Sequence, residues 1–186
     1  MLHTIILFIH VVSAMGIFAA MGVESMVLGQ LGRATDDASA GAAFANYKSV
    51  QRVGGPSMGL TLLAGLTLAG MYWGWRLGWI DVALASIVLF IIVDVTLSGR
   101  THGKLKGAAT ASAVHAAVPT LRKSLILRVW ILAGIVFLMT NKLALWPSVI
   151  VIAVAFVLAL IVGMGVRGQE GTSGASYQGQ ATGSAR

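Results

Sequence analysis

The sequence predicts an all-α membrane protein: a polytopic transmembrane helical bundle of five spans, with its N-terminus outside and its C-terminus cytoplasmic. Three observations lead to this fold class. Hydrophobic residues make up 57% of the 186 residues and charged residues only 10%, whereas a soluble domain carries about 25% charged residues. Five apolar runs approach the roughly 20 residues that cross a hydrocarbon core. Lysine and arginine gather between those runs.

The predicted spans cover residues 2–28, 56–75, 79–97, 125–140 and 147–166. No basic residue precedes the first run and Arg33 follows it, so we expect a retained first helix rather than a cleaved signal peptide. Span four is the weakest because its apolar stretch is short, and four spans is therefore the alternative. Arg128 lies near its start, where we expect the side chain to snorkel toward the headgroups.

The two long connections carry most of the basic residues, and they decide the orientation. Short cytoplasmic loops are enriched in Lys and Arg, so these connections and the tail are predicted to lie inside. The net charge of +7 then reflects topology, and no nucleic-acid partner is expected. The basic residues of the two connections are Arg33, Lys48, Arg52, Arg100, Lys104, Lys106, Arg122 and Lys123.

Both long connections have helical signals of their own. Thr35, followed by two aspartates, predicts an N-cap, with a helix running to Arg52 and stopped by the Gly-Gly-Pro sequence at 54–56. Apolar residues at helical spacing in 114–125 either extend span four, bent near Pro119, or form a segment on the membrane surface.

The chain divides into a bundle over residues 1–167 and a tail. Residues 168–186 are rich in Gly, Ser, Gln and Thr, which predicts a disordered cytoplasmic tail. In the bundle, Gly55 and Gly59 form a GxxxG pair, and we expect it to mark a helix contact within the bundle, with dimerisation as the second reading.

Polar residues inside the spans are the candidate functional residues. His3, His10 and Glu24 follow a seven-residue spacing and share one face of span one, and Asp94 lies on span three at a depth similar to that of Glu24. Ionisable residues in a bilayer are costly, usually face the bundle interior and often mark function.

His10 has several readings. It lies roughly 9 Å inside the outer boundary, where it could ligate haem b or copper, take part in a proton path, or bond a neighbouring helix as a neutral histidine. His3 is about 10 Å away along the helix, too far to share an ion, and its place at the interface is explained by solvation. Because His102 and His115 belong to the second long connection and are expected to be solvated, a haem would need His10 plus a methionine or a second subunit.

Glu24 and Asp94 have two readings. Either they form ion pairs with Arg52 and Arg100 that hold helix ends, or they line a cytoplasmic-side vestibule for an ion or proton. The sequence has no cysteine and no phosphate-binding loop, HExxH motif or nucleophile elbow, so an enzymatic activity has no support.

The segment LHTIILFIHVVSAMG at 2–16 resembles the opening of a family of small bacterial predicted integral membrane proteins of unknown function. The segment FLMTNK at 137–142, followed by Trp146 and Pro147, is similar to the late Leu-Met-x-x-Lys-Pro segment of that family. The resemblance extends from Leu2 to about Val166 and implies a bundle of four or five helices in a bacterial cytoplasmic (inner) membrane. More distantly, the pattern is similar to copper-resistance and cytochrome b-like membrane bundles, which implies a metal or haem role for His10.

Three functions follow from these observations. The leading hypothesis is a non-enzymatic membrane protein that packs in the lipid bilayer against other membrane subunits or forms a homo-oligomer. The alternatives are a haem- or metal-binding redox protein that uses His10, and a proton-coupled or ion transporter that uses Glu24 and Asp94.

Overall fold

The computed structural model describes residues 1–73, 77–105 and 110–183, with side chains described as far as Met164 except at position 104. The described residues form helices and contain no strand. Five helices are long and apolar enough to cross a membrane, which confirms the predicted bundle of five spans. The candidate spans are Leu2–Arg33, Asp37–Trp73, Gly78–Gly103, Ala111–Asn141 and Leu145–Met164.

The chain forms two helical hairpins joined by a third unit. The first hairpin consists of α1 (Leu2–Arg33) and α2 (Asp37–Leu68), which ends in a π-helical turn, η1 (Ala69–Trp73). In the third unit, α3 (Gly78–Val93) passes through a second π-helical turn, η2 (Asp94–Gly99), into α4 (Arg100–Leu105). The last hairpin consists of α5 (Ala111–Asn141) and α6 (Leu145–Gly183).

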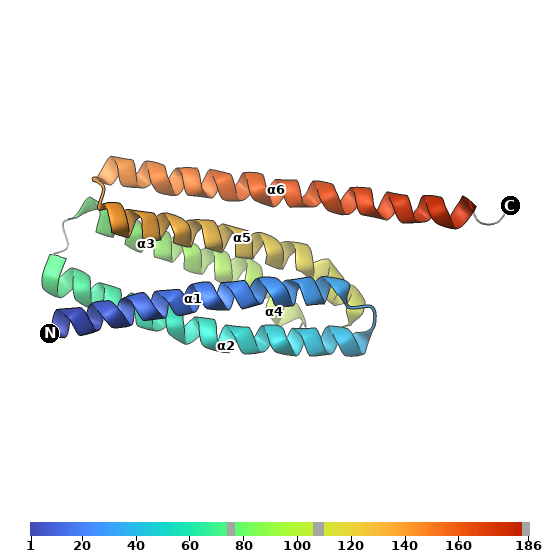
Figure 1. Cartoon of the computed structure of the whole chain (residues 1–186), viewed down its shortest axis with the longest axis horizontal. Helices are drawn as coiled ribbons and strands as arrows, with labels where there is room; N and C mark the ends of the chain where they lie inside the picture. The colour runs from blue at the N-terminus through green and yellow to red at the C-terminus, as the bar shows by residue number, and fades with distance from the viewer. Residues whose placement is uncertain (74–76, 106–109, 184–186) are drawn as a thin grey trace.

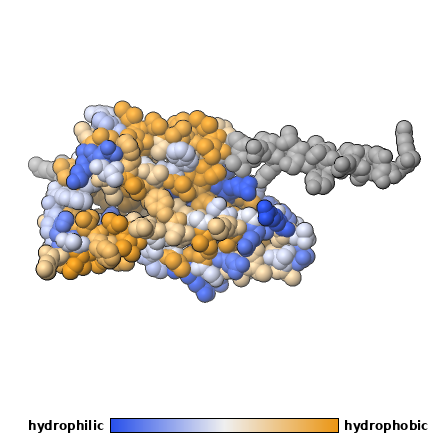
Figure 2. All heavy atoms as spheres, viewed as in Figure 1, coloured by the Kyte–Doolittle hydropathy of each residue, from blue (hydrophilic) through white to orange (hydrophobic). Residues whose placement is uncertain are grey.

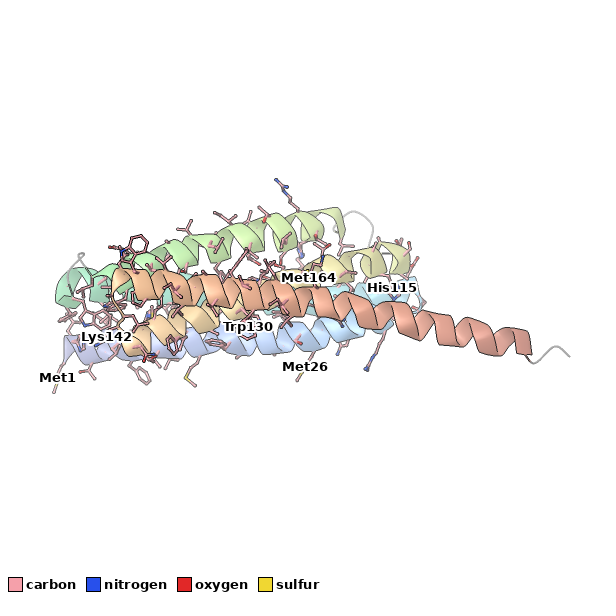
Figure 3. The ribbon with its side chains drawn as sticks, turned by 90° about the horizontal axis from the view of Figure 1, so that it is seen from above. Met1, Met26, His115, Trp130, Lys142 and Met164 are labelled. Atoms are coloured by element: carbon pink, nitrogen blue, oxygen red, sulfur yellow. The ribbon has the colours of Figure 1, made fainter. Side chains whose placement is uncertain are left out.

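The helices run along one long axis (Figure 1), with α6 on one side, α1 and α2 on the other, and α3 and α5 between them. α1 packs along α2, and α5 packs against α6, α3 and α1. By contrast, the backbones of α2 and α3 scarcely approach each other within the described ranges. Met1 and Lys142 lie at one end of the bundle and His115 at the other (Figure 3). We name these the Met1 end and the His115 end.

The beginning and the course of α2 correct two predictions. The N-cap of α2 is Asp36 rather than Thr35, and the backbone N–H of Ser39 donates to the Asp36 carboxylate at 2.8 Å. The predicted stop at 54–56 is wrong, because α2 continues through Pro56 to Leu68. Proline and glycine are tolerated within membrane helices whose neighbours support the backbone, and α1 packs along this part of α2.

The second long connection is largely helical. α5 begins at Ala111 and contains Pro119, so the segment before span four extends it rather than lying apart on the membrane surface. The start of α5 is tied to α2, because the backbone N–H of Ala111 donates to Asp37 Oδ1 at 2.7 Å. At the other end of the chain, α6 continues to Gly183. The disorder predicted for residues 168–186 stays a prediction, because the structure describes side chains only as far as Met164.

The surface of the bundle is apolar over much of its area, as one face shows in Figure 2. Large hydrophobic side chains such as Phe8, Met26 and Ile150 are more than half exposed. A soluble protein would not leave so many exposed, whereas a surface that faces lipid requires them. Polar groups that are buried within this bundle therefore stand out, and they define the site below.

Candidate functional site

Arg128 of α5 lies at the centre of a buried ion cluster. The residue is 4% exposed. Its Nη2 donates to Glu24 Oε1 at 2.5 Å, and its Nη1 lies 3.0 Å from Asp94 Oδ1. The predicted snorkelling of Arg128 is wrong, because α5 begins well before this residue, at Ala111, and two neighbouring helices supply carboxylates inside the protein. We name Glu24, Asp94 and Arg128 the triad.

Glu24 is the fully enclosed carboxylate of the triad. It is 2% exposed, and it accepts a hydrogen bond from the Tyr47 hydroxyl at 3.2 Å in addition to that from Arg128. The same hydroxyl accepts a hydrogen bond from Gln51 Nε2 at 3.3 Å. Charge-assisted hydrogen bonds of this kind are the strong ones, so α2 and α5 together fix the position of the α1 carboxylate.

Asp94 is held less completely. It begins the π-helical turn Asp94–Gly99, a distortion that is frequent at functional sites. Its side chain is 34% exposed. Although its Oδ1 lies 3.0 Å from Arg128 Nη1, that buried atom accepts no hydrogen bond from the described residues. The two groups thus attract as charges without the alignment that a hydrogen bond needs.

The charges of the triad do not balance. Two carboxylates face one guanidinium, so the cluster carries one negative charge in excess when both acids are ionised. An uncompensated charge is costly away from water. Asp94, whose side chain is 34% exposed, is the carboxylate of the triad that a balancing positive charge from outside the cluster can reach.

Two cavities meet at Asp94. The first, which we name the vestibule, has a volume of about 310 Å³. The second, the triad cavity, has a volume of about 180 Å³ and is lined by all three triad residues. Gln51 and Asp94 line both. The vestibule is lined by Tyr47, Lys48, Gln51, Arg52, Asp94, Ser98, Gly99 and His102.

A third cavity, of about 180 Å³, surrounds His10 nearer the Met1 end, and we name it the His10 cavity. Met58 of α2 and Phe90 of α3 line the triad cavity, and Thr61 and Ile87, three residues along each helix, line the His10 cavity. Because 3.6 residues make one turn, about one helical turn separates the two. The three cavities therefore follow the seam between α2 and α3, whose backbones do not pack closely.

His10 is positioned by α2. Its Nδ1 lies 2.8 Å from the carbonyl oxygen of Thr61. A carbonyl oxygen only accepts, so Nδ1 carries the hydrogen and, in the neutral ring, Nε2 keeps the lone pair. Gly65 makes room for the ring, because a Cβ there would lie 2.9 Å from His10 Cε1. Met139 of α5 lines the same cavity.

The remaining predicted residues lie elsewhere. His3 packs edge-on against Tyr72, with ring centroids 4.6 Å apart. Within the part of the chain that is described, Glu24 and Asp94 pair with Arg128 and with neither Arg52 nor Arg100. Arg52 lines the vestibule and Arg100 does not.

The two histidines of the second connection are part of the helical structure. His102 packs against Phe44, with ring centroids 5.1 Å apart. His115 bridges two helices, since its Nε2 lies 3.2 Å from the carbonyl oxygen of Gly32 and its Nδ1 lies 3.0 Å from that of Ala111. His115 is exposed, as expected for a solvated residue, whereas His102 is only partly exposed. Both residues lie in helices rather than in a loop.

Sequence reasoning missed the central role of Arg128 and the contribution of Tyr47. The sequence feature that pointed to Arg128 was its position among apolar residues that continue the helical spacing of 114–125. Of the two readings of that run, the one that extends span four places Arg128 inside the span, and it is the one that the structure shows. Tyr47 left no signal, because only the hairpin of α1 and α2 brings its hydroxyl to Glu24.

The donor atoms of the described side chains restrict metal chemistry. No three His, Cys, Asp or Glu residues among them lie close enough together to hold a metal ion. The triad is thus an ion cluster with access to two cavities, in a protein that crosses the membrane several times. Comparison with protein-family models, curated proteins and solved structures gives no match for the chain.

Proposed function

We propose that the protein is a proton-coupled carrier whose coupling site is the triad and whose path follows the seam between α2 and α3. One observation carries the proposal. Asp94 shares Arg128 with a second carboxylate, lacks a hydrogen bond at its buried oxygen among the described residues, and lines two adjoining cavities.

The charge of the triad supports proton coupling. Glu24 has two hydrogen-bond donors and is enclosed, whereas Asp94 has only the attraction of the Arg128 guanidinium and is open to the vestibule. A proton that enters the vestibule meets Asp94 first. Protonation removes the excess negative charge, and release of the proton restores it, so the cluster alternates between two charge states at one carboxyl group.

The arrangement of the cavities supports a path with a closed section. The vestibule and the triad cavity adjoin, while the apolar side chains of Met58 and Phe90 lie toward the His10 cavity. A carrier must not be open from both sides at once. On the Met1 side, the path continues past His10 and Thr61, which line the His10 cavity.

The test is proton movement into proteoliposomes that contain a pH-sensitive dye, in potassium phosphate buffer with an imposed pH gradient. We expect the wild-type protein to dissipate the gradient and Asp94→Asn to lose this activity. Asp81→Asn is the matched control, since Asp81 lies on α3 but lines none of the three cavities. Wild-type rates equal to those of empty liposomes, or an unchanged rate in Asp94→Asn, would refute the proposal.

A second candidate function is a copper-binding role for His10. The free Nε2 lone pair and the Met139 thioether, which line one cavity, are ligands suited to Cu(I). The cavity volume of about 180 Å³ is below the roughly 300–1,000 Å³ of drug-sized ligand pockets, so the site favours a single ion over haem. Metal analysis and air-oxidised and dithionite-reduced absorption spectra of wild-type and His10→Ala protein test it. A colourless, metal-free wild-type sample after copper exposure excludes both cofactors.

A third candidate is the predicted role as a packing partner of other membrane subunits or of a second copy. It is supported by Gly55 and Gly59, where an added Cβ would meet nothing within 4 Å. The expected contact of this pair within the bundle is therefore not made by the described residues, and a helix from another chain could approach there. Molar mass of the protein–detergent complex by light scattering tests this, and a monomeric wild-type protein that purifies alone from native membranes would count against it.

A further inference from the structure

We propose that the vestibule binds a small oxyanion with one negative charge, of the carboxylate or phosphate class. The inference rests on the proposed carrier function and names the cargo that moves with the proton. Three features of the vestibule support the inference: the positive side chains of Lys48 and Arg52, the second amide hydrogen of Gln51, and the position of Asp94.

Two cations face the vestibule from one helix. Lys48 and Arg52 lie four residues apart on α2, which places them one above the other on the same face. Both are exposed, and neither forms an ion pair with the described carboxylates. Side chains on a helix lean toward its N-terminus, which for α2 is the His115 end, so both charges lie where a ligand enters from water.

The charges of the whole site leave room for one anion. Lys48, Arg52 and Arg128 are positive, and Glu24 and Asp94 are negative, so the vestibule and the triad together carry one net positive charge. A ligand with one negative charge neutralises the site while Asp94 is ionised, and once Asp94 is protonated the site carries two positive charges and attracts the anion more strongly. A metal cation would raise the charge further and meet two unpaired basic side chains at the entrance.

Neutral donors in the vestibule also suit an oxyanion. Gln51 donates one amide hydrogen to the Tyr47 hydroxyl, and its second amide hydrogen has no acceptor among the described residues. The volume of about 310 Å³ lies near the lower limit of about 300 Å³ for ligand pockets, so the cargo is small.

Asp94 links the anion to the proton. It is the only carboxylate among the described residues that line the vestibule. When it takes up a proton, the vestibule loses that negative charge and Nη1 of Arg128 loses its counter-ion. The affinity for an anion then rises, so that one proton and one singly charged anion bind together as a neutral pair.

The test is isothermal titration of the full-length protein in a neutral detergent with sodium acetate and with sodium phosphate, against sodium chloride at equal ionic strength. We expect saturable binding by the wild-type protein and a loss of about tenfold or more in affinity for each cation removed in Lys48→Gln and Arg52→Gln. Asp94→Asn, which imitates the protonated carboxyl, should bind about tenfold more tightly. Far-UV circular dichroism checks that each variant is folded.

The matched control is the double variant Arg33→Gln/Arg100→Gln, which removes two positive charges on α1 and α4 without altering the vestibule. It should bind as the wild-type protein does. The proposal is overturned if the wild-type protein shows no saturable binding, or if this control loses as much affinity as Lys48→Gln/Arg52→Gln.

Lipid headgroups and free anions share this chemistry, and nanodiscs distinguish them. If phosphate binds in phosphatidylcholine nanodiscs and phosphatidylglycerol abolishes its binding, the site is supported with a lipid as the source of the oxyanion. Binding that persists in phosphatidylglycerol supports a free anion. Anion binding without proton flux leaves the site standing and removes the carrier function, whereas proton flux without anion binding retains the carrier and removes the oxyanion.

Discussion

The guanidinium of Arg128 and the carboxylate of Glu24 are in direct contact at 2.5 Å, although the two residues lie 104 positions apart in the chain. The contact joins the first span to the fourth. Both side chains are almost fully buried, so each depends on the other for compensation of its charge. This interdependence leads to the first prediction.

Replacement of Arg128 by methionine should destabilise the protein by about 3–5 kcal/mol, because it leaves two carboxylates without their cation. Glu24→Gln should cost less, because Arg128 then remains balanced by Asp94. The free energy of unfolding in detergent, measured by circular dichroism during titration with sodium dodecyl sulfate, checks the order. Arg100→Met, which removes an exposed arginine of α4, is the control and should have little effect. Equal stability of all three variants would contradict the buried pair.

Tyr47→Phe should destabilise the protein by about 2 kcal/mol, since it removes a hydrogen bond to a charged group. The loss arises at the Glu24 carboxylate, which accepts the Tyr47 hydroxyl hydrogen bond. Tyr72→Phe is the matched control, because Tyr72 is 41% exposed and its hydroxyl has no hydrogen-bond partner among the described residues. The same unfolding measurement applies, and identical effects of the two substitutions would show that the Tyr47 hydroxyl contributes nothing.

Gly65→Ala should displace the ring of His10, because the new Cβ would lie 2.9 Å from Cε1 and 3.3 Å from Nδ1. The hydrogen bond to the Thr61 carbonyl should then be lost, and the preference of the ring for hydrogen on Nδ1 with it. Nitrogen-15 chemical shifts of the histidine rings measure which nitrogen carries the hydrogen. Gly59→Ala, where a Cβ meets open space, should leave the His10 signals unchanged. An unaltered His10 spectrum in Gly65→Ala would contradict the close packing.

The orientation of the bundle is a further prediction, based on the basic residues of the two long connections. A fluorescent-protein fusion after Arg33 should fluoresce in the cytoplasm, and an alkaline-phosphatase fusion after Lys142 should be active outside. Reversal of both results would place the N-terminus inside. The vestibule would then open to the opposite side of the membrane, which would reverse the direction from which a proton reaches Asp94.

The sequence was informative about spans because a membrane helix satisfies its backbone hydrogen bonds within itself. Five apolar runs were therefore enough to predict five helices. Their ends were harder to predict. α2 passes through Pro56, and α5 begins at Ala111 rather than near residue 125, because packing against neighbouring helices supports turns that local composition would interrupt.

Composition and hydropathy by themselves determined that the chain is an all-α protein of five membrane-spanning helices with polar residues on the first and third. Only the tertiary structure decided what those residues meet. Glu24 and Asp94 form ion pairs with Arg128 rather than with Arg52 and Arg100, and His10 forms a hydrogen bond with the Thr61 carbonyl. The physical reason is that transfer into lipid is a property of each segment, which its own residues decide, whereas the partner of a buried charge depends on how separate helices rotate and pack.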